Sequence, residues 1–200
     1  MKYKVVLLDI DGVFINSGKF TERFSQQYGT PVEKMMPFFK GNFQLCLLDK
    51  LDLKEELEKV KGDWGFTGSV DALMKFWFEG EASIDQVVLR AIGRLSQSGF
   101  IVVGAANQEK YRTQYLQDQL KLNDIFDKMY ISVQMEVKKP DAEFYLKIAQ
   151  DQKVDFNEIV YWDDDVSNVE KACGLGIKAY LFQDDAKFVR QLQDDLNIRI

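Results

Sequence analysis

From residue 100 onward, short apolar runs of strand length alternate with longer segments that carry apolar residues at helical spacing. This alternation is typical of βαβ units, in which parallel strands pair in one sheet and helices cover both faces. It predicts an α/β fold with a Rossmann-like parallel sheet of about five strands. The expected strands are 3–8, 100–104, 129–133, 158–162 and 178–182, and the expected covering helices are 110–120, 141–151, 168–175 and 186–196.

The stretch between the first two expected strands has little strand character and several helical segments. At 200 residues the chain is long enough for one core and a small accessory unit. We therefore expect an α-helical cap at 14–82, inserted into an α/β core formed by 1–13 and 83–200. The helices expected in this region are 20–28, 32–39, 53–61 and 70–78, followed by an amphipathic helix, 85–98, that returns the chain to the sheet.

The sequence contains no histidine, which excludes Ser-His-Asp triads, Cys-His dyads, imidazole zinc sites and phosphohistidine intermediates. Any catalysis must therefore use carboxylates, lysines, hydroxyls or a hard metal. A net charge of −6 argues against nucleic acid or an anionic membrane as the main partner, since both require a basic surface.

No apolar run approaches the roughly 18 residues of a membrane span, and the lysines near the start lead into a strand rather than a cleavable signal. Cys46 and Cys173 lie far apart and lack CxxC spacing, so we expect two buried thiols in a reducing compartment. These features predict a cytoplasmic protein. They leave open whether it is a monomer or a homodimer.

Two of the apolar runs end in pairs of carboxylates. The first run ends in Asp9 and Asp11, and the fourth ends in Asp163 and Asp164. Each pair alone is compatible with an ordinary turn, because Asp is a favoured turn residue. In an open α/β sheet, however, ligands bind at the carboxyl ends of strands. If the first and fourth strands are neighbours, these carboxylates converge on an all-oxygen site of the kind that suits Mg²⁺.

Two further segments follow expected strands. Lys139, before a proline at a helix start, could neutralise a phosphate or hold a carboxylate in its charged form. Ala106 and Asn107, after the second strand, could offer backbone N–H groups and one amide to an anion. A solvated lysine and an ordinary strand-to-helix loop account for the same residues.

An Asp-x-Asp-Gly after the first strand, a Lys-Pro some 130 residues later and an Asp-Asp-x-x-x-Asn after the fourth strand resemble three of the four signature motifs of the haloacid dehalogenase-like hydrolases. The resemblance covers 1–13 and about 83–200, and the segment 139–145 resembles the branch with a small helical cap after the first strand. It implies that Asp9 is the nucleophile that forms an aspartyl-phosphate. It also implies that Asp11 is the general acid and base, and that Lys139 pairs with Asp9 and the phosphate.

The same resemblance implies Mg²⁺ as the cofactor and a small phosphorylated metabolite, such as a sugar phosphate, as the substrate of a phosphatase. The chemistry is sound on general grounds, because a carboxylate is a recognised nucleophile toward phosphoryl groups, and metal and lysine offset the charge. The implied metal ligands are Asp9, the backbone carbonyl of Asp11, Asp163 and Asp164, and the implied phosphate- and substrate-binding residues are Ala106, Asn107 and Lys139.

The chain departs from the family pattern at Ala106, where the second motif has a Ser or Thr that hydrogen-bonds the phosphoryl group. Loss of one such donor costs on the order of 10²–10³ in rate where nothing replaces it. A weakly active or non-catalytic phosphate-binding descendant therefore stays open, and so does a sugar phosphomutase, because it shares the same core motifs. Dehalogenation fits less well, because it dispenses with metal while Asp11, Asp163 and Asp164 are retained.

The inserted cap is expected to close over the substrate as a lid. Some of its aromatic and basic residues could line the substrate pocket, although most are expected in the cap's own core. These residues are Phe38, Phe39, Lys40, Phe43, Trp64, Lys75 and Trp77.

Overall fold

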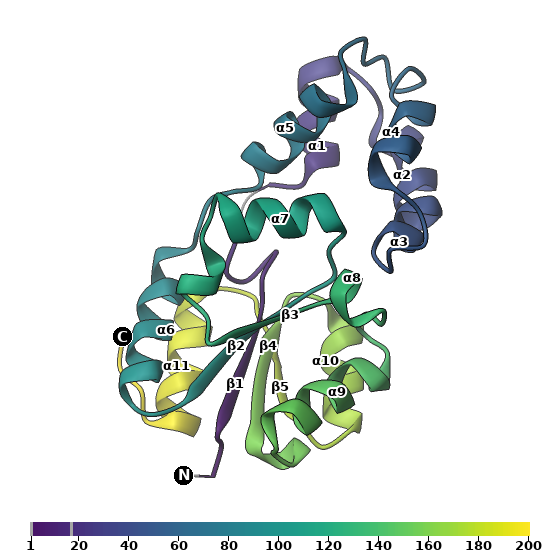
Figure 1. The fold of residues 1–200 in the computed structure, drawn as a ribbon. Coiled ribbons are helices and arrows are strands. Elements are labelled where there is room, and N and C mark those ends of the chain that lie inside the picture. The colour runs from purple at the N-terminus through teal and green to yellow at the C-terminus, as the bar shows by residue number, and fades with distance from the viewer. Residues whose placement is uncertain (1, 17) are drawn as a thin grey trace.

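The computed structural model describes residues 2–16 and 18–200. Met1 and Ser17, which fall within the expected core and cap, lie outside the described residues. Within the described part of the chain, five parallel strands form one sheet in the order β3-β2-β1-β4-β5. This confirms the α/β, Rossmann-like fold with a helical insertion after the first strand (Figure 1). The strands are β1 Val5–Asp9, β2 Ile101–Ala106, β3 Lys128–Ile131, β4 Ile159–Asp163 and β5 Lys178–Leu181.

Helices cover both faces of this sheet. The helix pair α6 and α11 lies on one face, and α9 and α10 lie on the other (Figure 1). The helices that belong to the sheet region are α6 Gln86–Gln97, α7 Lys110–Asp118, α8 Ser132–Met135, α9 Ala142–Gln152, α10 Val166–Gly174 and α11 Asp185–Leu196, with 3-10 turns at Leu122–Asp124 and Phe156–Glu158.

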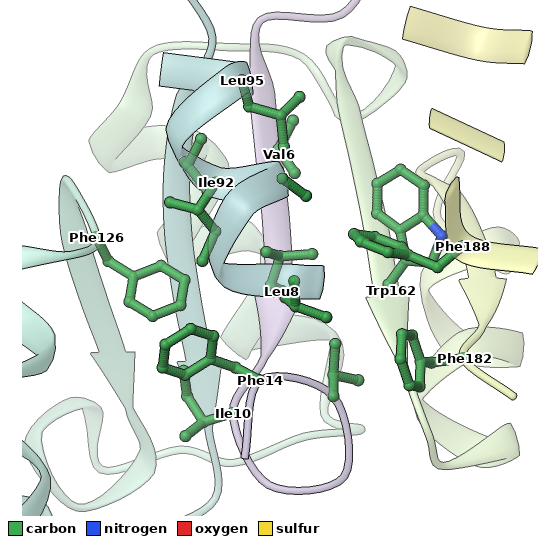
Figure 2. Close-up of a cluster of buried hydrophobic side chains, with 14 of the residues drawn as sticks. Val6, Leu8, Ile10, Phe14, Ile92, Leu95, Phe126, Trp162, Phe182 and Phe188 are labelled. Atoms are coloured by element: carbon green, nitrogen blue, oxygen red, sulfur yellow. The ribbon is translucent and has the colours of Figure 1, made fainter. Parts of the chain in front are cut away.

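The central strand β1 is buried on both faces. Val6 and Leu8 pack in the cluster that includes residues of α6 and α11, whereas Val5 and Leu7 pack in the cluster that includes residues of α9 and α10. A strand covered on both sides needs apolar residues at every position, which is why its sequence is continuously apolar. Figure 2 shows the first cluster, including Val6 and Leu8 of β1 and the bulky rings around them.

The inserted helices pack around a separate aromatic cluster that includes Phe24, Trp64 and Trp77. They lie beyond the carboxyl edge of the sheet, next to α7 (Figure 1). None of the helices in the described residues is long and apolar enough to cross a membrane. The inserted helices are α1 Phe20–Tyr28, α2 Val32–Lys40, α3 Asn42–Cys46, α4 Leu53–Val60 and α5 Val70–Gly80.

The two segments that join the insertion to the core lie side by side. Ile15 pairs with Ile84 in an isolated antiparallel bridge, and the Asn16 N–H donates to the Ser83 carbonyl over 3.0 Å. We propose that the core (1–13 and 83–200) and the cap (14–82) divide at this paired connection.

Several local expectations differ from the structure. The strand expected at 129–133 ends at Ile131, and the chain turns into α8 because the Ser132 hydroxyl bonds with the backbone of Gln108 on the neighbouring loop. The second strand runs on to Ala106 instead of ending at residue 104. The expectation of two buried thiols is wrong for Cys173, which is exposed on α10, while Cys46 is buried.

Candidate active site

The sheet order brings the acidic strand ends together. The strand β1 pairs with β4 through Leu8 and Trp162, so Asp9 and Asp163 follow at the same edge. On the other side β1 pairs with β2, which ends in Ala106. The chain thus leaves β1 between two parallel neighbours, the position at which open α/β sheets bind ligands.

Lys139 joins the two strand ends. Its Nζ lies 2.7 Å from Asp9 Oδ1 and 2.7 Å from Asp163 Oδ2, and it also donates to the Ala105 carbonyl over 3.2 Å. All three charged side chains are buried, with the lysine side chain only 2% exposed. Removing one member of such a buried ion-pair network typically costs about 3–5 kcal/mol, because the partner charge is left without compensation. The positions of these residues are therefore fixed together.

Asp163 is held from several directions besides Lys139. Asn168 Nδ2 donates to both of its carboxylate oxygens, over 3.0 and 3.1 Å, and the Asp165 N–H donates to Oδ1 over 2.8 Å. The Tyr161 hydroxyl donates to Oδ2. These bonds fix the carboxylate as an anion at the end of β4.

The charges at this site do not balance. Burial raises the pKa of Asp9 well above its usual range, and Asp163 and Asp164 add to the rise, whereas Lys139 acts in the opposite direction. Burial also acts to raise the pKa of Asp163, but Lys139 and the hydrogen bonds from neighbouring side chains outweigh it, so this pKa is lowered. Partial desolvation of its carboxyl group and the nearby Asp163 raise the pKa of Asp164, although the residue is exposed at its outer side. Three acids therefore share one lysine.

A divalent cation fits this arrangement. Carboxylate oxygens of Asp9, Asp163 and Asp164 all lie within 4.8 Å of one another, and hard oxygen ligands of this kind suit Mg²⁺. Gly12 makes room for one of them. Its φ is +95°, and a Cβ at this position would lie 2.3 Å from Asp164 Oδ2. A glycine is thus required both by the backbone turn and by the close approach of Asp164.

Asp11 points to a different set of partners. Gln108 Nε2 donates to its Oδ2, and Arg112 Nη2 lies 3.2 Å from its Oδ1. Arg112 is 2% exposed and also donates to the carbonyls of Phe78 and Glu81, over 2.9 Å to Phe78. This arginine therefore connects the second carboxylate of the motif to the segment through which the insertion returns to the core.

Glu109 starts the helix that carries this arginine. Its carboxylate accepts from the backbone N–H groups of Tyr111 and Arg112, over 2.7 and 2.5 Å, which caps α7. Burial raises the pKa of Glu109 to about 7, although both of these bonds act to lower it. The cap bonds locate Arg112 at the first turn of the helix.

Ala106 and Asn107 lie at the end of β2 as expected. Ala106 is buried and offers no hydroxyl. The Asn107 side chain pairs with the backbone of Lys139, donating to its carbonyl and accepting from its N–H, each over 2.9 Å. The side-chain amide of Asn107 thus positions Lys139. We therefore propose the backbone N–H of Asn107, and not its side chain, as the group that binds an anion.

A cavity of about 420 Å³ opens beside Asp11, between the inserted helices and the loop after β2. Of the cap residues considered from the sequence, Phe39, Phe43 and Trp77 line it. Phe38 and Trp64 pack in the cap core and border a different surface hollow. Lys40 and Lys75 are exposed to solvent.

The sequence pattern did not identify Gln108, Arg112 or Tyr161 as site residues. Arg112 lies in a helix whose charged residues are otherwise solvated, so nothing local distinguishes it. Tyr161 reads as one more apolar position of a buried strand. Only for Gln108 did the sequence offer an indication, because this residue directly follows Ala106 and Asn107 at the end of the second strand.

A model of the family described as haloacid dehalogenase-like hydrolase matches residues 6–182 of this chain. A protein from Porphyromonas gingivalis described as a predicted HAD-like family hydrolase has a similar structure, with a TM-score of 0.82 at 19% identity and coverage of 100% of both chains. A HAD family enzyme from Bacteroides thetaiotaomicron, in complex with magnesium and inorganic phosphate, has a TM-score of 0.75 at 23% identity and covers 90% of this chain and 94% of that chain.

Bifunctional epoxide hydrolase 2 of Rattus norvegicus is 29% identical over 115 residues, which are 56% of this chain. The match spans 21% of that relative, so its whole-protein activity does not transfer. The solved structures establish the likeness of fold, and the family model extends over most of the chain. The chain belongs to the haloacid dehalogenase-like hydrolases.

Proposed function

We propose that this protein is a Mg²⁺-dependent phosphatase that hydrolyses a small phosphomonoester through an aspartyl-phosphate on Asp9. One observation carries the proposal: the Asp9 carboxylate lies 2.7 Å from the buried Lys139 and within 4.8 Å of two further carboxylates, at the ligand-binding edge of the sheet. A nucleophilic carboxylate, a fixed cation and a hard-metal ligand set are the components that phosphoryl transfer requires.

Attack starts from the free oxygen of Asp9. Its Oδ1 accepts from Lys139 and from the Ile10 N–H, each over 2.7 Å, and among the described residues Oδ2 has no such partner. In the proposed reaction Oδ2 forms a bond to phosphorus as the ester P–O bond breaks. Lys139 keeps Asp9 oriented and offsets the negative charge of the phosphoryl oxygens. The backbone N–H groups at Ala106 and Asn107 would support the same oxygens.

Asp11 handles the protons. It donates a proton to the departing alkoxide, and then, as a carboxylate, takes a proton from the water that attacks the aspartyl-phosphate. That second step cleaves the acyl phosphate, releases inorganic phosphate and restores Asp9. Gln108 and Arg112 hold Asp11 for both steps through their bonds to its two oxygens.

Asp9, Asp163 and Asp164 would hold the metal, together with the backbone carbonyl of Asp11. When bound, Mg²⁺ supplies positive charge that lets one anion approach another. The enzyme from Bacteroides thetaiotaomicron, which has a similar fold, was solved with magnesium and inorganic phosphate, and this supports both the cofactor and the substrate class. Inorganic phosphate is the product that the proposed reaction releases.

We prefer phosphatase activity over dehalogenation because three of the proposed metal ligands lie close together. A dehalogenase with an aspartate nucleophile needs no divalent cation, yet three carboxylates lie within 4.8 Å of one another here. A chelator separates the two reactions, since it should abolish phosphate release and leave halide release unaffected.

Ala106 favours a second candidate, a phosphate-binding protein with weak or no turnover. A sugar phosphomutase shares the same core and differs only in returning the phosphoryl group to a sugar. The observation behind the weakly active form is specific: a buried methyl group stands where the family has a hydroxyl.

The test is phosphate release from a panel of phosphomonoesters, with Mg²⁺ and with chelator, for the wild-type protein and for Asp9→Asn. We expect the variant to lose all turnover but still to unfold cooperatively in urea, at a lowered midpoint, because the amide has the shape of the carboxylate and Lys139 keeps its ion pair with Asp163. Asp155→Asn, which alters the capping aspartate before the amino end of β4, at the edge of the sheet opposite the site, is the matched control and should retain activity. Appreciable turnover by Asp9→Asn would remove Asp9 as the nucleophile, and production of an isomeric sugar phosphate without phosphate release would identify a mutase.

A further inference from the structure

The cavity beside Asp11 has two unlike sides. Its core side is formed by Asp11, Asn107 and Gln108, so a phosphoryl group at Asp9 would have its leaving group directed into this space. Its volume of about 420 Å³ is within the range of small-molecule pockets. The cap side is apolar, with the side chains of Phe20, Val32, Met36, Phe39, Phe43 and Trp77.

The aromatic part of this wall is already ordered. Trp77 stacks on Phe20 with ring centroids 4.8 Å apart, and Phe39 and Phe43 each lie 5.5 Å from Trp77. The indole N–H donates to Glu81 Oε2 over 2.7 Å, so the polar atom of Trp77 is already used. The rings therefore offer carbon surface and no hydrogen-bonding groups to an occupant.

The polar residues that line the cavity are also largely engaged. Glu81 accepts from the Phe20 N–H with one oxygen and from Trp77 with the other. The Asn107 amide is bound to the backbone of Lys139, and the Gln108 amide is bound to Asp11. Thr21 is half-buried, and Lys19 and Glu22 are exposed, so they can still bond to an occupant. Against the aromatic wall, however, a leaving group rich in hydroxyls would lose hydration and regain few hydrogen bonds, which is costly.

The charges of the lining disfavour a second anionic group. Besides Asp11, the described lining contains the acids Glu22 and Glu81 and the cation Lys19. Lys19 and Glu22 are exposed, so they lie toward the mouth. A leaving group with its own phosphate or carboxylate would meet more acidic than basic charge in this space.

We propose that the cavity binds the alcohol portion of the substrate, and that this alcohol is hydrophobic, an aryl or alkyl group without additional hydroxyls or charges. This inference rests on the proposed phosphatase function and narrows its substrate class away from sugar phosphates. Apolar contact with such a wall distinguishes substrates by roughly 10–100-fold in kcat/KM.

The experiment compares 2-phenylethyl phosphate with glucose 6-phosphate. Both release a primary alkoxide, so their intrinsic reactivity is similar and a difference reports binding by the cavity. We expect kcat/KM at least about 10-fold higher for the phenylethyl ester. Equal or higher kcat/KM for the sugar phosphate overturns this inference and leaves the phosphatase function standing. Failure to hydrolyse these esters, ethyl phosphate and the rest of the panel overturns both.

A pair of cap phenylalanines tests the location. Phe43→Ala should lower kcat/KM for 2-phenylethyl phosphate about 10-fold more than it lowers kcat/KM for ethyl phosphate, because the ethyl group offers the wall much less carbon surface. The matched control is Phe76→Ala, since Phe76 is a half-buried cap residue outside the cavity lining. Equal losses in the two variants, or a loss on ethyl phosphate as large as on the phenylethyl ester, would place the specificity elsewhere.

Discussion

Replacing Gly12 with alanine should separate two requirements that this glycine meets. The first is its backbone angle of +95°, and the second is the space that Asp164 occupies beside it. The added Cβ would lie 2.3 Å from Asp164 Oδ2 and 2.4 Å from Cγ, about 1 Å closer than the 3.4 Å at which ordinary contact begins. Asp164 is exposed, so it can swing away at little cost in stability, but the carboxylate then leaves the metal-ligand set.

Gly176→Ala is the matched control, because Gly176 has the same φ of +95° and a Cβ there would lie 4.0 Å from the Cβ of Phe156, an ordinary contact. Both variants should lose about 1–2 kcal/mol of unfolding free energy from the left-handed backbone alone. Only Gly12→Ala should also lose Mg²⁺ affinity, by about 10–100-fold, since Mg²⁺ tolerates little departure from ideal geometry.

Two measurements suffice for this comparison: urea unfolding without metal, and the rise in unfolding temperature as Mg²⁺ is added. Wild-type Mg²⁺ affinity in Gly12→Ala would refute the placement of Asp164 at the metal. Equal loss of affinity in both variants would show that general destabilisation, and not displacement of Asp164, is responsible.

Three further predictions concern the surroundings of Asp9. Ala106→Ser should raise turnover, by up to about 10²–10³-fold if the missing hydroxyl limits the rate, and no gain in kcat would show that another donor already serves the phosphoryl group. Arg112→Met should lower kcat by about 10–100-fold with little change in KM, because Arg112 contacts Asp11 and does not line the cavity; a change in KM alone would contradict this positioning role. Burial raises the pKa of Glu109 from its ordinary 4.5 to about 7, so the folded protein retains this proton longer than the unfolded chain does. The stability that this proton contributes is fully present below about pH 4.5 and is lost as the pH rises through 7. In Glu109→Gln the urea midpoint should therefore change less between pH 5 and pH 8 than it does in the wild type. An unchanged pH profile would show that Glu109 is not the source of the pH dependence.

Periodicity was a good guide to the elements whose burial follows simple rules. The first helix of the insertion, Phe20–Tyr28, begins and ends where the spacing of its apolar residues predicts. The central strand could be predicted because its burial on both faces makes its sequence continuously apolar. By contrast, α3 is a five-residue helix, Asn42–Cys46, which is too short for a periodic pattern to emerge.

The limits of the sequence are clearest where a distant contact decides the structure. The apolar residues around Ser132 continue a strand pattern, yet the strand ends there because the serine is bonded to a loop 24 positions earlier in the chain. In the same way, the carboxylates could be placed at strand ends from the sequence, whereas Arg112 could not. Its partners belong to two segments, one at Asp11 and one at Phe78 and Glu81, that are far from each other in the sequence, and only the fold brings them together.

The bridge between Ile15 and Ile84 marks the point at which the insertion could be exchanged by protein engineering. The backbones of Asn16 and Ser83 are one hydrogen bond apart, so the sixty-odd residues between them occupy the position of a hairpin turn. Exchanging that stretch for a two-residue linker would leave every strand of the sheet connected as before. The insertion can thus be exchanged for the lid of a relative to alter substrate choice, provided that the new lid replaces the two carbonyls, of Phe78 and Glu81, to which Arg112 donates.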